Sequence, residues 1–179
     1  AVLGMKAEDI ENTISSVDGV EIANYNCPGQ IVITGKKEGV ERAAELLKEN
    51  GAKRVIPLNV SGPFHSSMLK KAGQELEKIL ENQEVSPLKI PYVTNVTGEL
   101  IQDKAEIKPL LSRQISSPVR WQQSVENMIL NGVDTFVEIG PGRTLNGFIR
   151  KINRDVSVYS IQTVEDMEKV IQAVKEQSI

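Results

Sequence analysis

The order of strand-like and helix-like segments in the first 58 residues restricts the folds open to this chain. Six segments follow one another, β-rich at 1–3, 20–25, 30–34 and 54–58 and helical at 7–15 and 38–50. The second helical segment repeats apolar residues on one stripe and stops at Gly51, a residue type that commonly follows a helix. The order β-α-β-β-α-β is that of the ferredoxin-like split βαβ unit. We therefore expect a small ferredoxin-like subdomain over residues 1–58.

Residues 59–179 form a second region in which the two patterns alternate. The segments are helical at 68–80, 107–115, 121–129, 145–152 and 164–174 and β-rich at 91–96, 135–139 and 156–161. Alternation of this kind argues for an α/β domain whose parallel sheet is covered on both faces by helices. The chain also opens directly on a β-rich segment without an initiator methionine, so we expect it to be part of a larger protein.

The composition excludes several classes of function. Apolar residues make up 40% and charged residues 25% of the 179, and the net charge of −3 is spread along the chain, so we expect no nucleic-acid or anionic-membrane partner. No apolar stretch approaches the roughly 20 residues needed to span a bilayer. The single cysteine, Cys27, excludes an intrachain disulfide, and no Cys/His cluster could hold a metal. These features predict a cytoplasmic protein without a structural metal.

The only histidine, His65, follows a Gly-Pro turn at the expected end of a strand and precedes a helix. Such junctions lie at the sheet edge where ligands commonly bind, so His65 is a candidate general base. The alternative is a histidine that caps the helix or completes a loop. No G-x-S-x-G elbow is present, and Ser61, Ser66 and Ser67 are too close in sequence to face His65 well. A base is therefore present without a nucleophile.

Three polar turns have both a structural and a functional interpretation. The run from Asn24 to Gln30 is dense in amides, although spacing alone favours a hairpin connection. Gly140-Pro141-Gly142-Arg143 precedes a helix and could bind an anion or simply form a tight turn. The basic pair Lys53-Arg54 is either a solvated strand entry or a contact for a phosphate.

An ordered set of motifs resembles malonyl-CoA:acyl carrier protein transacylase over essentially the whole chain. The matching stretches are 24–33, 51–54, 60–66, 94–96, 113–115, 117–121 and 138–142. By this resemblance His65 is the catalytic histidine, and the backbone carbonyl of Gln114 holds its imidazole. Phe64 borders the acyl pocket and favours malonyl over methylmalonyl, with simple packing as the alternative. The remaining predicted substrate-binding residues are Asn24, Gln30, Asn95, Lys53 and Arg54.

The resemblance also implies residues that this sequence lacks. The family's nucleophilic serine in a G-H-S-x-G elbow, its carboxylate-binding arginine and its Gly-Gln-rich loop all lie upstream of the matched region. We therefore expect a C-terminal portion, with residues 1–58 as the small subdomain and 59–179 as part of a hydrolase-like α/β core. This portion alone is expected to be inactive and to need the missing N-terminal part.

The intact enzyme is expected to move malonyl from coenzyme A to acyl carrier protein in fatty-acid synthesis, through a malonyl-serine ester and without a cofactor. Two alternatives stay open from the sequence. One is a stand-alone malonyl acyltransferase that serves a polyketide synthase, and the other is a non-catalytic ferredoxin-like binding module.

Overall fold

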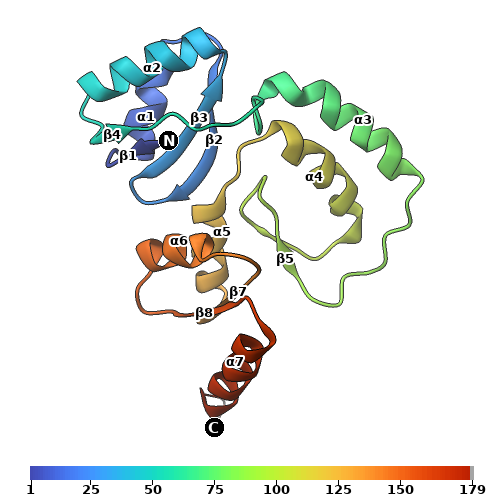
Figure 1. Cartoon of the computed structure of the whole chain (residues 1–179). Helices are drawn as coiled ribbons and strands as arrows, with labels where there is room; N and C mark the ends of the chain where they lie inside the picture. The colour runs from blue at the N-terminus through green and yellow to red at the C-terminus, as the bar shows by residue number, and fades with distance from the viewer. Residues whose placement is uncertain (178–179) are drawn as a thin grey trace.

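The computed structural model describes residues 1–177, and its class is α/β, as the alternating patterns predict. The first part consists of β1 (Val2–Leu3), α1 (Ala7–Ile14), β2 (Val20–Cys27), β3 (Gln30–Gly35), α2 (Lys37–Glu49) and β4 (Arg54–Val55). The four strands form one antiparallel sheet in the order β2-β3-β1-β4, with α1 and α2 beside it (Figure 1).

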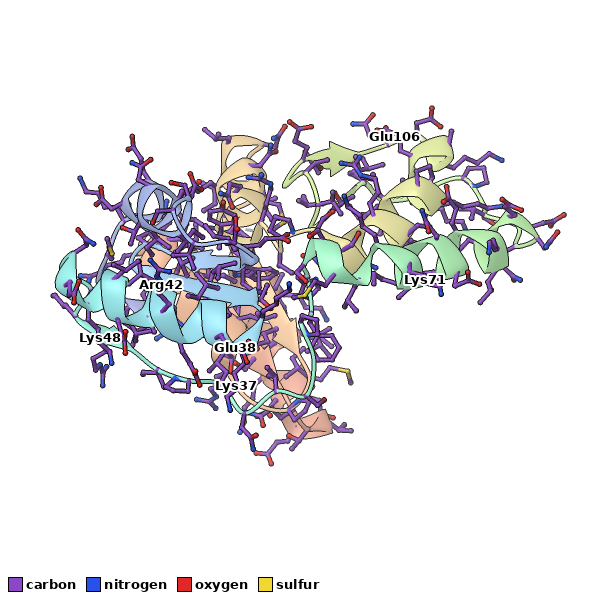
Figure 2. All side chains as sticks on the ribbon, turned by 90° about the horizontal axis from the view of Figure 1, so that it is seen from above. Lys37, Glu38, Arg42, Lys48, Lys71 and Glu106 are labelled. Carbon is purple, nitrogen blue, oxygen red and sulfur yellow. The ribbon has the colours of Figure 1, made fainter. Side chains whose placement is uncertain are left out.

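The largest apolar core of the described chain lies between this sheet and its two helices. Ile10 of α1 and Leu47 of α2 are fully buried, and they pack with Val2 and Ile31 of the sheet. Burial of each large aliphatic side chain contributes roughly 1.5–3 kcal/mol. The opposite side of α2 is exposed, and its charged side chains extend outward (Figure 2): Lys37, Glu38, Arg42 and Lys48.

The hairpin between β2 and β3 is tighter than the sequence suggests. The β-rich runs were expected at 20–25 and 30–34, but β2 continues to Cys27, which pairs directly with Gln30. Only Pro28 and Gly29 remain in the turn, and Gly29 has a φ of 74°. Proline fixes the first central φ and glycine accepts the positive second one, so this dipeptide makes a two-residue reversal.

The second part begins with an irregular stretch, residues 56–66. The strand predicted to run to Leu58 ends at Val55 instead, because Pro57 has no N–H to continue the ladder. The following elements are η1 (Ser67–Leu69), α3 (Lys70–Glu81), β5 (Tyr92–Val93), β6 (Leu100–Ile101), η2 (Lys104–Glu106), α4 (Ile107–Arg113), η3 (Gln114–Ser116), α5 (Trp121–Leu130), β7 (Thr135–Ile139), α6 (Thr144–Ile152), β8 (Ser157–Ile161) and α7 (Val164–Gln177).

The single parallel sheet expected for this part is not what the described residues form. β7 and β8 pair in parallel, but β5 pairs antiparallel with β6 in a separate two-stranded sheet. The reversal follows from Gly98, which has a φ of 73° and donates its N–H to the carbonyl of Thr94 at 2.9 Å. Residues 178 and 179 of the predicted second domain lie outside the described part.

The two parts are joined at the free edge of β2. The N–H of Val119 donates to the carbonyl of Ala23 at 2.8 Å, and the N–H of Tyr25 donates to the carbonyl of Val119 at 2.8 Å. This parallel bridge adds the segment before α5 to the edge of the first sheet (Figure 1).

None of the helices formed by residues 1–177 has both the length and the apolar character needed to cross a membrane.

Candidate active site

His65 is held in an unusual backbone conformation by the chain around it. Its φ is 58°, and no other non-glycine residue from 1 to 177 has a positive φ. Such strain costs on the order of 1–3 kcal/mol and persists where the surroundings over-determine it. Ser66 is fully buried, and its hydroxyl donates to the carbonyl of Pro63 at 2.7 Å. The turn is therefore braced internally at the residue next to His65.

The half-buried imidazole of His65 lies against a backbone carbonyl. Its Nδ1 is 3.0 Å from the carbonyl oxygen of Gln114. A carbonyl oxygen only accepts hydrogen bonds, so Nδ1 must carry the hydrogen in this contact. In the neutral ring Nε2 then keeps its lone pair and can accept a proton. The arrangement gives a base with a fixed tautomer and no charged orienting group.

Close helix packing places Gln114 beside His65. Gln114 begins η3 directly after α4, and α4 packs against α3. At the contact, a Cβ on Gly73 of α3 would lie 2.9 Å from the carbonyl oxygen of Ser112 in α4. The absence of a side chain at Gly73 lets the two helices approach closely.

Segment 114–120 contacts two of the predicted substrate-binding residues. Asn24 on β2 forms the parallel bridge with Val119, and the carbonyl of Asn95 accepts a hydrogen bond from the N–H of Arg120 at 2.8 Å. The same short segment starts at Gln114, the partner of His65. Asn24 and Asn95 therefore both contact the short connection whose first residue, Gln114, holds the imidazole.

Three other predicted residues lie around β1 instead. Gln30 and Arg54 both pair with Leu3, from the two sides of β1. The side chain of Lys53 lies over Gly4, and Gln30 Oε1 accepts a hydrogen bond from Lys151 of α6 at 3.3 Å. Among the described residues, the structure gives no contact between this group and His65. β4 is an edge strand of the first sheet, and α3 starts on the far side of that sheet from β4 (Figure 1).

Phe64 precedes the histidine and is 53% exposed. Its ring lies near Gly62, at 3.5 Å from the position of a Cβ there. The ring is not part of any of the three buried clusters of the described chain. The aromatic surface next to His65 is thus open to solvent.

The sequence profile of the acyl transferase domain matches residues 1–175. This chain belongs to the acyl transferase family. The match extends well past residue 58, so the family relation is not confined to the small subdomain.

Relatives of this acyl transferase chain carry one recurrent name. The chain is 45% identical to the malonyl CoA-acyl carrier protein transacylase of Bacillus subtilis, over 99% of this chain and 57% of that protein. It is 46% identical to the protein of the same name in Staphylococcus aureus, over 94% of this chain and 56% of the other. The chain therefore spans little more than half the length of these relatives.

Solved structures of the acyl transferase family resemble the chain closely. The malonyl CoA-acyl carrier protein transacylase of Clostridium perfringens superposes with a TM-score of 0.94 at 42% identity, covering 99% of this chain and 57% of that one. A malonyl-transacylase in complex with a type II PKS acyl-carrier protein gives a TM-score of 0.92 at 36% identity, covering 96% and 57% of the two chains.

The cysteine of this acyl transferase chain is poorly suited to act as a nucleophile. Cys27 is fully buried, and burial raises the pKa of its thiol above the ordinary value. Two residues away, burial and the hydrogen bond from Tyr25 Oη to Glu11 at 2.6 Å raise the pKa of Tyr25 to about 12. Arg120 lies 5.4 Å from the centroid of the Tyr25 ring. This part of β2 is therefore a packed support beside the site.

The structure also gives contacts that the sequence patterns do not reveal. Glu21 of β2 accepts two hydrogen bonds from Ser67, directly after the His65 turn. Its place between buried Val20 and Ile22 indicates that it faces away from the core, but nothing in the sequence names its partner. Within residues 1–177 no group of three or more His, Cys, Asp or Glu side chains could hold a metal ion.

Proposed function

We propose that the intact enzyme containing these residues transfers a malonyl group from coenzyme A to the pantetheine thiol of acyl carrier protein. The observation that carries the proposal is the contact between His65 Nδ1 and the Gln114 carbonyl, which leaves Nε2 free as a base. The names of the relatives, malonyl CoA-acyl carrier protein transacylases, supply the substrate class. His65 and Gln114 are the proposed catalytic residue and its orienting partner.

In this mechanism His65 serves two successive transfers. Nε2 takes the proton of a serine hydroxyl as its oxygen attacks the malonyl thioester, and the protonated ring returns that proton to the departing coenzyme A thiolate. The ring then takes the proton of the carrier thiol, whose sulfur attacks the malonyl-serine ester, and gives it to the departing serine oxygen. A histidine that acts as general acid and base typically raises the reaction rate on the order of 10²–10⁴-fold.

The serine belongs to a part of the enzyme outside this sequence. The 179 residues contain no G-x-S-x-G elbow, and Cys27 is buried with a raised pKa. We therefore propose that this chain alone is inactive and acts with an N-terminal portion. That portion would also supply the arginine for the malonyl carboxylate. The chemistry needs no cofactor, because proton transfer and acyl exchange are complete with these groups.

Exposed apolar surface supports a further packing partner for the second part. Val137 and Ile139 lie on one face of β7 and are 39% and 78% exposed, although parallel strands are ordinarily covered on both faces. We propose that this face packs against the N-terminal portion. Residues 59–179 would then be part of a hydrolase-like α/β core. Residues 1–58 would be its ferredoxin-like subdomain, consistent with the strand order β2-β3-β1-β4.

The remaining predicted residues receive roles by position. Phe64 would border the acyl pocket, since its open ring lies next to His65. Asn24 and Asn95 would line the cleft near segment 114–120. Gln30, Lys53 and Arg54 lie around β1, and we propose that they contact the nucleotide end of coenzyme A.

A second carrier deserves a direct comparison, because one structural neighbour is a complex with a type II PKS acyl-carrier protein. The acyl transfer is the same with either carrier. We propose that the natural carrier is that of fatty-acid synthesis. We also propose that the enzyme works in the reducing cytoplasm, the compartment in which an unpaired cysteine such as Cys27 is expected. Initial rates with the two carrier proteins, measured side by side, distinguish the alternatives.

A labelling experiment tests the proposed function. Radiolabelled malonyl-CoA is incubated with the intact enzyme, with its His65→Ala variant and with the 179-residue chain, and acylated protein is separated by electrophoresis. We expect a labelled band for the intact enzyme that is discharged by carrier protein, much slower labelling for His65→Ala, and none for the chain. A stable acyl adduct on the 179-residue chain would mean that the nucleophile lies within it.

A further inference from the structure

The turn that carries His65 is fastened to the small subdomain by a carboxylate from a distant part of the chain. Glu21 lies on β2, and one of its carboxylate oxygens accepts a hydrogen bond from the backbone N–H of Ser67 at 3.0 Å. The other oxygen accepts a hydrogen bond from the Ser67 hydroxyl. Two donors of one residue thus hold both oxygens of one carboxylate, and hydrogen bonds to a charged acceptor are the stronger kind.

The Glu21 contact lies directly after the backbone strain at His65. His65 has a φ of 58°, and Ser67 is two residues further, at the start of η1. The bond from Ser66 to Pro63 lies within the turn, and the Gln114 carbonyl contacts the ring of His65. Glu21 differs from both because it ties the backbone after His65 to the first sheet.

We propose that Glu21 is a positioning residue for His65. With Ser67 held, the strained turn keeps Nδ1 of the imidazole on the Gln114 carbonyl, and Nε2 remains the basic nitrogen. Without the carboxylate the turn can relax, and the ring is free to adopt the Nε2–H tautomer that a solvated imidazole favours. The consequence for catalysis rests on the proposed function, whereas the effect on the imidazole does not.

The single histidine of the chain makes the test direct. Two-bond ¹H–¹⁵N correlation spectra of the 179-residue chain, at a pH where the ring is neutral, contain one imidazole and report its tautomer. We expect mainly Nδ1–H in the unmodified chain. In Glu21→Ala we expect the ratio of Nδ1–H to Nε2–H to fall on the order of tenfold, as the loss of a charge-assisted hydrogen bond implies.

Matched variants separate positioning from folding. Glu21→Gln keeps one oxygen that can accept from Ser67, so it should restore part of the ratio. Ser67→Ala removes one of the two bonds and should give a smaller fall in the same direction. Glu45→Ala removes an exposed carboxylate of α2 for which no hydrogen bond is found among the described residues, and it should leave the ratio unchanged. Circular dichroism checks that each variant is folded.

The outcomes decide two questions separately. An unchanged tautomer ratio in folded Glu21→Ala and Ser67→Ala chains overturns the positioning role; if Glu21→Ala does not fold, Ser67→Ala decides. In the intact enzyme, Glu21→Ala should lower kcat for malonyl transfer by about tenfold with KM unchanged. A shifted ratio in an enzyme that never transfers malonyl would refute the proposed function and leave the role of Glu21 standing.

Discussion

His65 and Gln114 contribute to the candidate site through different groups, one through its side chain and the other through its backbone. In the proposed mechanism the imidazole moves protons, whereas Gln114 contributes its backbone carbonyl, which lies 3.0 Å from Nδ1. In the intact enzyme, His65→Ala should lower the rate of malonyl transfer about 10²–10⁴-fold. Gln114→Ala should cost much less because the carbonyl survives, and the two losses should not add. Equal losses in steady-state kinetics of the two variants would show that the Gln114 side chain has a role of its own.

The residues of the site were only partly predictable from the sequence. His65 stands out because it is the one histidine and follows a Gly-Pro turn. The pairing with Gln114, 49 residues away, follows no spacing rule and came from family resemblance alone. Glu21 had no sequence signal, because a strand position reveals which face a side chain occupies but not what lies opposite.

At the scale of elements, the close approach of α3 and α4 supports Gln114. A Cβ at position 73 would lie 2.9 Å from the carbonyl oxygen of Ser112, and a backbone atom cannot move aside cheaply. Gly73→Ala should therefore lower the free energy of unfolding by about 1–3 kcal/mol, as overpacking does. The matched control is Gly147→Ala in α6, where nothing lies within 4 Å; it should be neutral or stabilise by roughly 0.5–1 kcal/mol. Chemical denaturation of both variants checks this, and equal effects would contradict the packing argument.

Helices were more predictable than strand pairing. The periodic segments at 121–129 and 145–152 lie within one residue of α5 and α6, because an apolar stripe is a local signal. The pattern at 91–96 predicts a strand but not its partner. Its antiparallel pairing depends on the reversal at Gly98, which sends the chain back to β6.

At the scale of the whole molecule, apolar burial is unevenly divided. The cluster in residues 1–55 includes four fully or almost fully buried aliphatic residues, namely Val2, Ile10, Ile31 and Leu47. The second part has two smaller clusters, one around Val96 and Leu110 and one around Val125 and Phe136. A single continuous core supports independent folding better than divided ones do.

This difference predicts how the two parts behave when they are expressed separately. Residues 1–58 should fold as a marginal domain, weakened by the loss of the Val119 bridge on the edge of β2. Residues 59–179 should aggregate or exchange their amide hydrogens rapidly. Leu130 and Ile139 are 85% and 78% exposed, and this part has only two small buried clusters among its described residues to stabilise it. Amide hydrogen exchange and light scattering of the two pieces measure this, with the 179-residue chain as the reference. If residues 59–179 were monomeric and well protected while residues 1–58 were unfolded, the predicted order of stability of the two parts would be reversed. The exposed face of β7 would then not require a packing partner.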